Sequence, residues 1–314
     1  MSYTARRFGA CAGDLWHLGD MKTPTPDDRQ AEGISVVIPA YNEASSVARV
    51  VTDLRVHLDD LGTLYEIIVI DDGSSDETSE CARQAGARVY AHSQNRGYGA
   101  AVKTGVRLAQ HLWILLIDAD GSYPAESVRE FVPHMQVADM VVGTRTRPGA
   151  KVPRMRQPMK WILRRLAEFL AGARIPDLNS GMRLFRRDLF EESRRLLPDG
   201  FSLTTTLTLL FFSESRHVEN VPIDYDERAG TSKFRPIRDT WSTILLLVRT
   251  VMLFNPLKIF LPLSAVLFLA AVAVAVLSYT VLDRLLDTTF VVLLLSSLQI
   301  LALGFLADLV NRRR

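Results

Sequence analysis

Two long apolar stretches near the C-terminus constrain the fold of this chain more than any other feature. Residues 259–280 (IFLPLSAVLFLAAVAVAVLSYT) are 22 residues without a charge, and residues 288–307 are another 20. Each reaches the length of about 20 residues that a helix needs to cross the hydrocarbon core of a membrane. Two buried helices in a large soluble core are the alternative, but the rest of the chain offers no other long amphipathic elements to cover them. We therefore predict a membrane hairpin over residues 256–314.

Basic residues around the two stretches predict the orientation of the hairpin. Lys258 precedes the first stretch and Arg312, Arg313 and Arg314 follow the second, whereas the connecting VLDRLLD has one Arg against two Asp. Lys and Arg near membrane spans favour the cytoplasmic side. We therefore expect a protein with two spans whose termini both lie in the cytoplasm. The N-terminus lacks the apolar region of a signal peptide, so we expect no cleavable signal.

Short apolar segments alternate with helical patterns before the hairpin. Residues 1–32 are polar, contain TPTPDD and show no sustained period, so we expect a flexible tail there. Five β-branched, apolar segments then predict buried strands: ISVVIP, EIIVI, ARVYA, LWILLID and MVVG. Between them, apolar residues recur at helical spacing, as in the stripe of residues 47–58 that Gly62 closes. This alternation predicts an α/β domain over residues 33–235, with a mostly parallel sheet and helices on both faces.

Carboxylates gather where the predicted strands end, which is where ligands bind in a parallel sheet. In LIDADGSYP, Asp118 and Asp120 would repel each other unless a cation lay between them. Acidic residues at strand ends are also common simply because strands end at the surface. Several such residues converging on one edge favour a cationic or polar ligand: Glu43, Asp71, Asp72, Asp76, Glu77, Asp118 and Asp120.

Other ligand motifs are absent from the sequence. No G-x-G-x-x-G follows the first strand, which argues against a dinucleotide oxidoreductase, and GYGAAVKTG lacks the Gly-Lys-Ser/Thr of a P-loop. Cys11 and Cys81 offer neither a disulfide framework nor a zinc spacing. A nucleotide would have to be held in another way.

Two segments mix basic and apolar residues as helices at a membrane surface do. Between Arg145 and Arg195 there are 14 Lys or Arg against five Asp or Glu, a balance of +9. A solvated helix face is the usual explanation, but beside a membrane anchor we favour contact with anionic headgroups over contact with nucleic acid. Residues 236–255 carry an apolar stripe beside Arg238 and Arg249, which predicts a juxtamembrane amphipathic helix or, alternatively, a core-packing one.

Four motifs, in this order and spacing, resemble those of the inverting glycosyltransferases of family 2: VVIPAYNE, IIVIDDGSSDET, NRGYGAAVKTG and LLIDADGSYP. The resemblance covers residues 34 to about 235 and implies the GT-A fold, which is Rossmann-like. It also implies a divalent metal, Mg²⁺ or Mn²⁺, bound by Asp118 and Asp120 on the diphosphate, with Asp120 in the catalytic group. The residues implied to bind the nucleotide sugar are Pro39, Tyr41, Glu43, Asp71, Asp72 and Asp118.

The later part of the chain resembles one branch of that family, the dolichyl- and polyprenyl-phosphate hexosyltransferases. DLNSGMRLFRRD, VPIDYDERAGTSKFRP and the apolar hairpin carry this likeness, and the Q-x-x-R-W motif of processive polysaccharide synthases is absent. The likeness implies a lipid-phosphate site formed by Arg145, Arg183, Arg228, Ser232 and Lys233. Arg145 and Arg228 would also belong to the catalytic group, and Arg183 could instead tie a loop to a carboxylate.

The resemblance implies transfer of a hexose, mannose or glucose before others, from a GDP- or UDP-sugar to a polyprenyl or dolichyl phosphate on the cytoplasmic leaflet. A phosphate monoester with a second pKa of about 6 is largely dianionic at neutral pH, so it needs cations and alignment and no general base. Transfer to another membrane acceptor, such as a diacylglycerol, and a non-catalytic nucleotide-binding scaffold are the alternatives. Gly121 and Ser122 stand where many mannosyl transferases of this branch have an amide, which leaves the donor open. A homo-oligomer is also left open.

Overall fold

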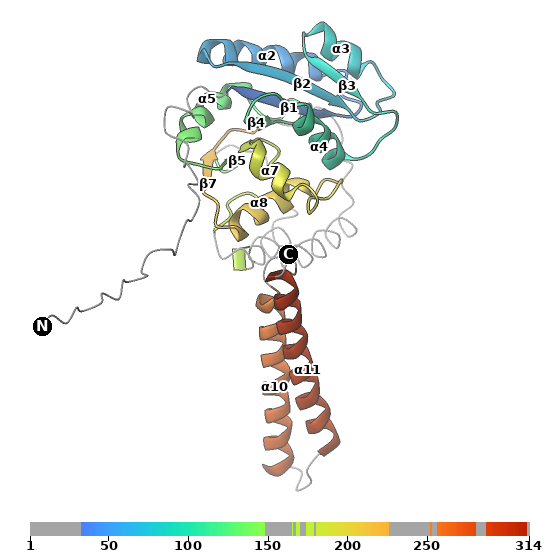
Figure 1. Cartoon of the computed structure of the whole chain (residues 1–314), viewed down its shortest axis with the longest axis vertical. Coiled ribbons are helices and arrows are strands. Elements are labelled where there is room, and N and C mark those ends of the chain that lie inside the picture. Colours follow the sequence, from blue (N-terminus) through green and yellow to red (C-terminus); the bar gives the residue numbers. More distant parts are fainter. Residues whose placement is uncertain are drawn as a thin grey trace, which may run out of the picture.

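The computed structural model describes residues 33–147, 165, 168, 169, 174–178, 180–225, 252, 256–280 and 287–312. The expected N-terminal tail over residues 1–32 lies outside them. So does the expected amphipathic helix over residues 236–255, apart from Met252. Within the described part, a sheet domain and a pair of long helices can be followed in Figure 1.

Seven strands form one sheet in the order β3-β2-β1-β4-β6-β5-β7 (Figure 1). Strand β1 runs parallel to β2 and β4, β2 runs parallel to β3, and β5 runs parallel to β7. The predicted mostly parallel sheet is therefore confirmed. The strands are β1 (Ile34–Ala40), β2 (Tyr65–Asp71), β3 (Arg88–Ala91), β4 (Trp113–Leu116), β5 (Met140–Thr144), β6 (Arg183–Arg186) and β7 (Val218–Pro222).

Strand β6 is antiparallel to both of its neighbours, β4 and β5, and no periodicity in the sequence predicts it. Its first residue, Arg183, pairs with Leu116 at the end of β4 and with Val142 near the end of β5. The chain therefore enters β6 at the edge where β4 and β5 finish. This topology brings the residues just before β6 next to the acidic loop that follows β4.

Helices cover both faces of the sheet, as the sequence predicts. One face packs against α2 (Val47–Leu61), α3 (Thr78–Gln84) and α5 (Val128–Phe131), and the other against α4 (Tyr98–Leu108), α7 (Arg187–Ser193) and α8 (Leu203–Ser213). Each face of the sheet has its own hydrophobic core, and alternate residues of a strand point into one core or the other. Val36 and Ile38 of β1 belong to the first core, and Val37 belongs to the second. This period of two is the expected geometry of a strand buried on both faces.

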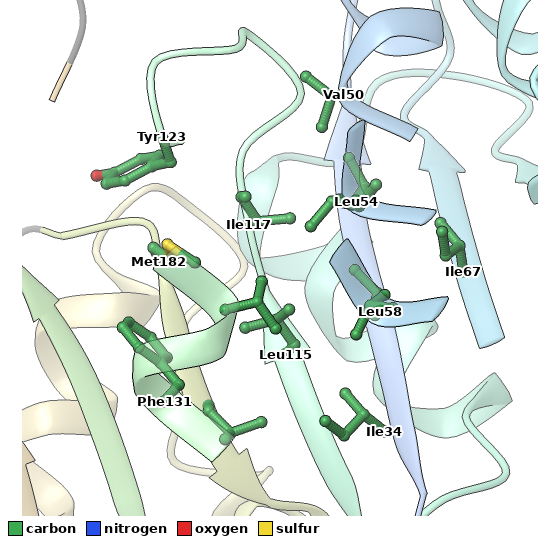
Figure 2. Packing of buried hydrophobic residues seen from close by; sticks show 14 of the residues in the cluster. Ile34, Val50, Leu54, Leu58, Ile67, Leu115, Ile117, Tyr123, Phe131 and Met182 are labelled. Carbon is green, nitrogen blue, oxygen red and sulfur yellow. The ribbon is translucent and has the colours of Figure 1, made fainter. Parts of the chain in front are cut away.

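The core around α2 shows how local sequence sets this packing. The predicted stripe is buried, and Leu54 and Leu58 point towards Leu115 and Ile67 of the sheet (Figure 2). The helix ends at Gly62, which has a φ of 62° and takes the left-handed C-terminal position that glycine adopts without strain. The apolar stripe and its terminating glycine therefore fix both the buried face and the length of α2.

The helical pattern over residues 124–135 gives three short pieces in place of one helix. They are the 3₁₀ helix η1 (Ala125–Ser127), α5, and the 3₁₀ helix η2 (Val132–Gln136). Pro133 explains the second break, since proline has no N–H to continue an α-helical ladder.

Two long helices, α10 (Leu257–Thr280) and α11 (Asp287–Arg312), lie side by side and project from the sheet domain (Figure 1). Both are long and apolar enough to cross a membrane, with mean hydropathies of 2.7 and 2.4, and 11% of each apolar window is buried. They are not core helices of this chain, because most of their apolar surface faces outward. The Ser264 hydroxyl donates to the Ser297 carbonyl oxygen at 3.0 Å and joins the two helices.

Candidate active site

The acidic loop after β4 lies at the edge where the parallel strands end. The hydroxyl of Tyr98, the first residue of α4, donates to Asp118 Oδ1 at 3.0 Å. Burial raises the pKa of Tyr98 well above its usual value, and the negative charge of Asp118 raises it further. The Tyr98 hydroxyl therefore stays protonated and holds this carboxylate in place across the physiological pH range.

Asp120 is almost completely buried and is held by the residue two positions later. Its Oδ1 accepts the backbone N–H of Ser122 at 3.0 Å and the Ser122 hydroxyl at 2.6 Å. Between them Gly121 has a φ of 71°, the left-handed conformation that lets the loop turn back on itself. The Gly-Ser pair that departs from the mannosyl transferase pattern therefore shapes the carboxylate loop itself.

Gly181 closes the other side of Asp118. A Cβ placed on Gly181 would lie 2.2 Å from Asp118 Oδ2 and 2.6 Å from its Cγ, so only glycine allows this approach. The Gly181 backbone N–H donates to the Tyr123 hydroxyl at 2.6 Å, which ties the turn before β6 to the acidic loop. The antiparallel strand therefore supplies one wall of the site.

Arg145, just after β5, forms a two-pronged ion pair with Asp177. Its Nε lies 2.7 Å from Asp177 Oδ2 and its Nη2 lies 2.9 Å from Oδ1. Burial alone would lower the pKa of Arg145, but its hydrogen bonds to Asp177 and the charge of that carboxylate raise it above the usual value. The guanidinium also lies 5.0 Å from the ring centre of Tyr225, which packs edge-on against Tyr123. Arg145 thus stays charged in a fixed position near the acidic loop.

Arg183 lies inside the protein and not at the site's surface. Its side chain is 0% exposed, and its guanidinium donates to the carbonyl oxygens of Ser180, Thr204 and Leu178 and to the Thr208 hydroxyl. Burial lowers the pKa of Arg183 to about 10. The sequence left two roles open for this arginine, and this position fits neither: it ties the turn before β6 to α8 through carbonyl and hydroxyl oxygens. Direct contact between Arg183 and a phosphate is not compatible with this arrangement.

Asp71 and Asp72 are both buried and both hold loops. Asp71 accepts the Ser74 backbone N–H at 2.8 Å and the Ser79 hydroxyl. Asp72 accepts the backbone N–H groups of Arg96 at 3.0 Å and Gly97 at 2.7 Å, which fixes the entry to α4. Both aspartates therefore position the loops of the edge, whatever contact they make with a ligand.

His92 extends the network around Asp72. Its Nδ1 lies 2.6 Å from Asp72 Oδ1, and its Nε2 lies 3.0 Å from the Thr104 hydroxyl oxygen. Because the Thr104 hydroxyl donates to the Ala100 carbonyl oxygen at 2.9 Å, it can only accept from His92. His92 therefore links Asp72 to α4 through the Thr104 side chain.

We expect Asp72→Asn to destabilise the protein strongly, because the NH₂ group of the new amide would face one of the backbone N–H groups that now donate to the carboxylate. A loss of about 2–4 kcal/mol is typical when a buried, charge-assisted network loses one member. Thermal unfolding of the full chain in detergent should show it as a fall of about 5–15 °C in Tm. Asp53→Asn, on the exposed face of α2, is the matched control and should change stability by no more than about 0.5 kcal/mol. Equal Tm values for the two variants would remove the role of Asp72 in holding the loop.

The loop after β1 packs on the loop after β2. The backbone N–H groups of Asn42, Glu43 and Ala44 donate to the side chains of Ser74, Thr78 and Asp76, at 2.9, 2.9 and 3.2 Å. Asn42 has a φ of 56°, so this loop turns sharply. Pro39 is buried within β1, Glu43 is half-buried, and Tyr41 is exposed at the edge.

Several residues that shape the site carry no role in the sequence-based prediction: Tyr98, Tyr123, Asp177, Gly181 and Phe201. Phe201 is 85% exposed, and its ring stacks on the ring of Tyr98 with centroids 5.7 Å apart. Asp177 and Gly181 stand inside DLNSGMRLFRRD, so that motif was the available signal for them. Arg228, Ser232 and Lys233 lie outside the described residues.

The acidic loop offers few protein ligands to a metal. Within the described ranges, no three His, Cys, Asp or Glu side chains are grouped to hold an ion. Asp118 and Asp120 supply carboxylate oxygens, which are the ligands that Mg²⁺ and Mn²⁺ prefer. Mg²⁺ often binds through one or two carboxylates, water and substrate phosphate, so this pair fits a metal that arrives with a diphosphate.

Comparison with known proteins identifies the class. Residues 35–194 match the glycosyl transferase family 2 domain, and residues 255–312 match the GtrB C-terminal hairpin. The chain belongs to glycosyl transferase family 2. It is a glycosyltransferase with a GT-A fold, which confirms the family, the fold and the enzyme class that the sequence implies.

Individual relatives agree with this assignment. A dolichyl-phosphate hexose transferase of Haloferax volcanii is 32% identical over 207 residues, which are 65% of this chain and 88% of that protein. Glycosyltransferase AglJ of the same organism is 34% identical over 76% of each chain. Glucosyl-3-phosphoglycerate synthase from Mycobacterium tuberculosis, solved with Mn²⁺, UDP and phosphoglyceric acid, superposes with a TM-score of 0.57 over 72% of this chain and 82% of that one. At 22% identity, that likeness shows a shared fold.

Proposed function

We propose that this protein transfers one hexose, mannose or glucose before others, from a nucleotide diphosphate sugar to a polyprenyl or dolichyl phosphate, with inversion at the anomeric carbon. One observation carries the proposal: a family 2 domain with an acidic pair at its sheet edge is joined to two apolar helices in the same chain. A soluble acceptor would not require such an anchor. The Haloferax volcanii relative named for dolichyl phosphate and hexose supports the same acceptor and donor class.

The donor would bind along the edge formed by the loops after β1, β2 and β4. Tyr41 is exposed there and would contact the base, beside Glu43 and the loop that Asp71 and Asp72 hold. Pro39 would shape the same wall from within β1. Asp118 and Asp120 would lie at the diphosphate end, where Mg²⁺ or Mn²⁺ would bridge phosphate oxygens and stabilise the charge of the leaving group.

The acceptor phosphate requires positive charge and alignment at the same end. Asp177 accepts hydrogen bonds from Nε and Nη2 of Arg145, and Nη1 lies outside this ion pair. Because the pair fixes the guanidinium, the direction of Nη1 is fixed as well. A preorganised guanidinium is well suited to a phosphate dianion. We propose that Arg145 gathers the acceptor together with Arg228, Ser232 and Lys233, and that Arg183 acts by holding the turn before β6.

The absence of an assigned general base agrees with this acceptor. An alcohol must lose its proton as it attacks, whereas a phosphate dianion attacks with an oxygen that is already charged. The protein's task is then to hold that oxygen in line with the anomeric carbon, which is worth several orders of magnitude in rate. We further propose that the catalytic domain and both termini are cytoplasmic, from the basic residues beside the spans.

A transfer assay with the purified full chain tests the proposal. Radiolabelled GDP-mannose and UDP-glucose are offered in detergent with Mg²⁺ or Mn²⁺ and either polyprenyl phosphate or diacylglycerol. We expect label to enter the lipid fraction with polyprenyl phosphate and one of the two donors, and chelation of the metal to abolish it. NMR of the product should show a β linkage from an α-linked donor.

The other outcomes separate the alternatives. Labelling of diacylglycerol alone would show that the enzyme uses a different membrane acceptor. Binding of a nucleotide sugar without labelling of either lipid would support a non-catalytic scaffold. A product that keeps the donor's anomeric configuration would overturn the inverting mechanism.

A further inference from the structure

Phe201 is the most exposed large apolar side chain among the residues that the structure describes, and it lies beside the acidic loop. The side chain is 85% exposed. Its ring stacks on the ring of Tyr98 at an interplanar angle of 18°. The hydroxyl of Tyr98 in turn donates to Asp118 Oδ1. One aromatic ring therefore separates Phe201 from the carboxylates at which the reaction is expected.

The turn of residues 198–201, which carries Phe201, is fixed to the start of α4. The Ala100 backbone N–H donates to the Asp199 carbonyl oxygen at 3.1 Å, and Lys103 Nζ donates to Asp199 Oδ1 at 2.8 Å. A Cβ placed on Gly99 would lie 2.3 Å from a backbone oxygen of this turn, so the turn and the helix approach as closely as only glycine allows. The exposed ring is thus presented by a rigid support.

A single exposed apolar side chain needs no explanation on its own, because such residues are common on protein surfaces. Two observations distinguish Phe201 from an ordinary surface residue. Its backbone is held by α4, and its ring packs on the residue that holds Asp118. The ring therefore forms an apolar border to a site whose other described walls are polar and charged.

The chemistry of the proposed acceptor requires an apolar contact near the acidic loop. In a polyprenyl phosphate, the first isoprene unit is bonded directly to the phosphate, so hydrocarbon must lie within a few bonds of the attacking oxygen. When the phosphate reaches the acidic loop, these first units are outside the hydrocarbon core, and covering them with apolar protein surface is favourable. Helix α8, which follows the turn, lies on the side of the sheet domain nearer to the two long helices (Figure 1).

We propose that Phe201 packs against the isoprene units next to the phosphate, so that the site selects a phosphate that carries an isoprenoid chain. This inference rests on the proposed function, because it requires a polyprenyl or dolichyl phosphate as acceptor. The phenyl ring has no hydrogen-bonding group, and its exposed surface suits a hydrocarbon. Contact with the hexose of the donor is the competing role, and the experiment separates the two.

Steady-state kinetics of Phe201→Ala in the full chain test the contact. The acceptors are a long polyprenyl phosphate and a short one, farnesyl phosphate, both in detergent. We expect the KM for both acceptors to rise by about 5- to 30-fold, the factor for the loss of one apolar contact. The KM for the donor and kcat should change by no more than about twofold, as when binding common to ground state and transition state is removed.

Val137→Ala is the matched control for Phe201→Ala. It also shortens an exposed apolar side chain, which is 62% exposed, but it lies shortly before β5, at the edge where the parallel strands begin. We expect its acceptor and donor KM values to equal those of the unmodified chain. Equal acceptor KM values for Phe201→Ala and Val137→Ala would overturn the inference.

Phe201→Leu separates contact with the acceptor from support of Tyr98. Leucine keeps most of the apolar surface but cannot stack, so the acceptor KM should stay within about threefold of the unmodified value. A loss as large as that of Phe201→Ala, with weaker binding of Mn²⁺ and nucleoside diphosphate, would mean that the ring acts through Tyr98 and would overturn the proposal.

The remaining outcomes also decide the matter. A higher KM in Phe201→Ala for the long acceptor alone would mean that Phe201 contacts the membrane and not the first isoprene units. A higher donor KM, or a changed rate of donor hydrolysis without acceptor, would mean that Phe201 contacts the hexose. If the unmodified chain transfers no sugar to either phosphate, the proposed function fails and this inference fails with it. If transfer occurs but does not depend on Phe201, this inference alone fails.

Discussion

Asp120→Asn should strongly reduce metal-dependent sugar transfer while leaving the fold intact. The amide oxygen of Asn can still accept both hydrogen bonds from Ser122, so the loop keeps its shape. What the substitution removes is a negative charge facing the proposed metal. A metal that neutralises a leaving diphosphate is worth several kcal/mol, so we expect a loss of about 100- to 1,000-fold in kcat/KM.

Metal binding gives this prediction a readout separate from activity. Titration with Mn²⁺ in the presence of a nucleoside diphosphate should show weakened binding in Asp120→Asn and an unchanged Tm. Asp60→Asn is the matched control, because it makes the same change of charge at a surface ion pair with Arg129. Turnover of Asp120→Asn equal to that of Asp60→Asn would remove the metal role of Asp120.

The sequence predicts those parts of the fold that depend on local patterns. The apolar stripe of α2 and the glycine that ends the helix can be predicted from the sequence, because the helical period and the left-handed C-terminal position are properties of a few consecutive residues. The acidic loop is readable for a similar reason: in a parallel sheet, strand ends share an edge, so residues that follow different strands converge. Glu43, Asp71 and Asp118 can therefore be grouped from the sequence alone.

The remaining features depend on partners far apart in the sequence. Strand β6 has only four residues, RLFR, and its basic ends hide the apolar run that marks the other strands. In the sequence, Arg183 cannot be told apart from an arginine that binds phosphate. Only the structure shows that its guanidinium is buried and surrounded by carbonyl oxygens from α8 and from its own turn. The role of Asp72 in holding the entry of α4 likewise emerges only when His92 and the Gly97 backbone are placed around it.

These hidden partners form a supporting layer behind the acidic pair. Tyr98 holds Asp118, the turn before β6 presses against the same carboxylate, and Arg183 ties that turn to α8. A carboxylate fixed from several sides loses little entropy when it binds a cation, which is the physical value of such preorganisation. The geometry of the pair should therefore be sensitive to changes in residues that carry no charge.

Gly181→Ala is the sharpest test of that sensitivity. The added methyl would overlap Asp118 Oδ2 at 2.2 Å, so either the carboxylate or the turn before β6 must move. A displacement of about 1 Å at a reacting site can cost about 100-fold in rate, and we expect a fall of about 10- to 100-fold in kcat/KM. The overlap should also cost about 1–3 kcal/mol of stability, as overpacking does.

Gly200→Ala separates the effect on the site from the effect of a methyl group. A Cβ on Gly200 meets nothing within 4 Å, and Gly200 is not among the glycines with positive φ, so that variant should keep its activity and its Tm. The apparent affinity for Mn²⁺ is the deciding measurement, because a purely structural defect at Gly181 would lower stability without weakening the metal. Metal affinity and kcat/KM in Gly181→Ala equal to those of Gly200→Ala would mean that Asp118 is not held by the turn before β6.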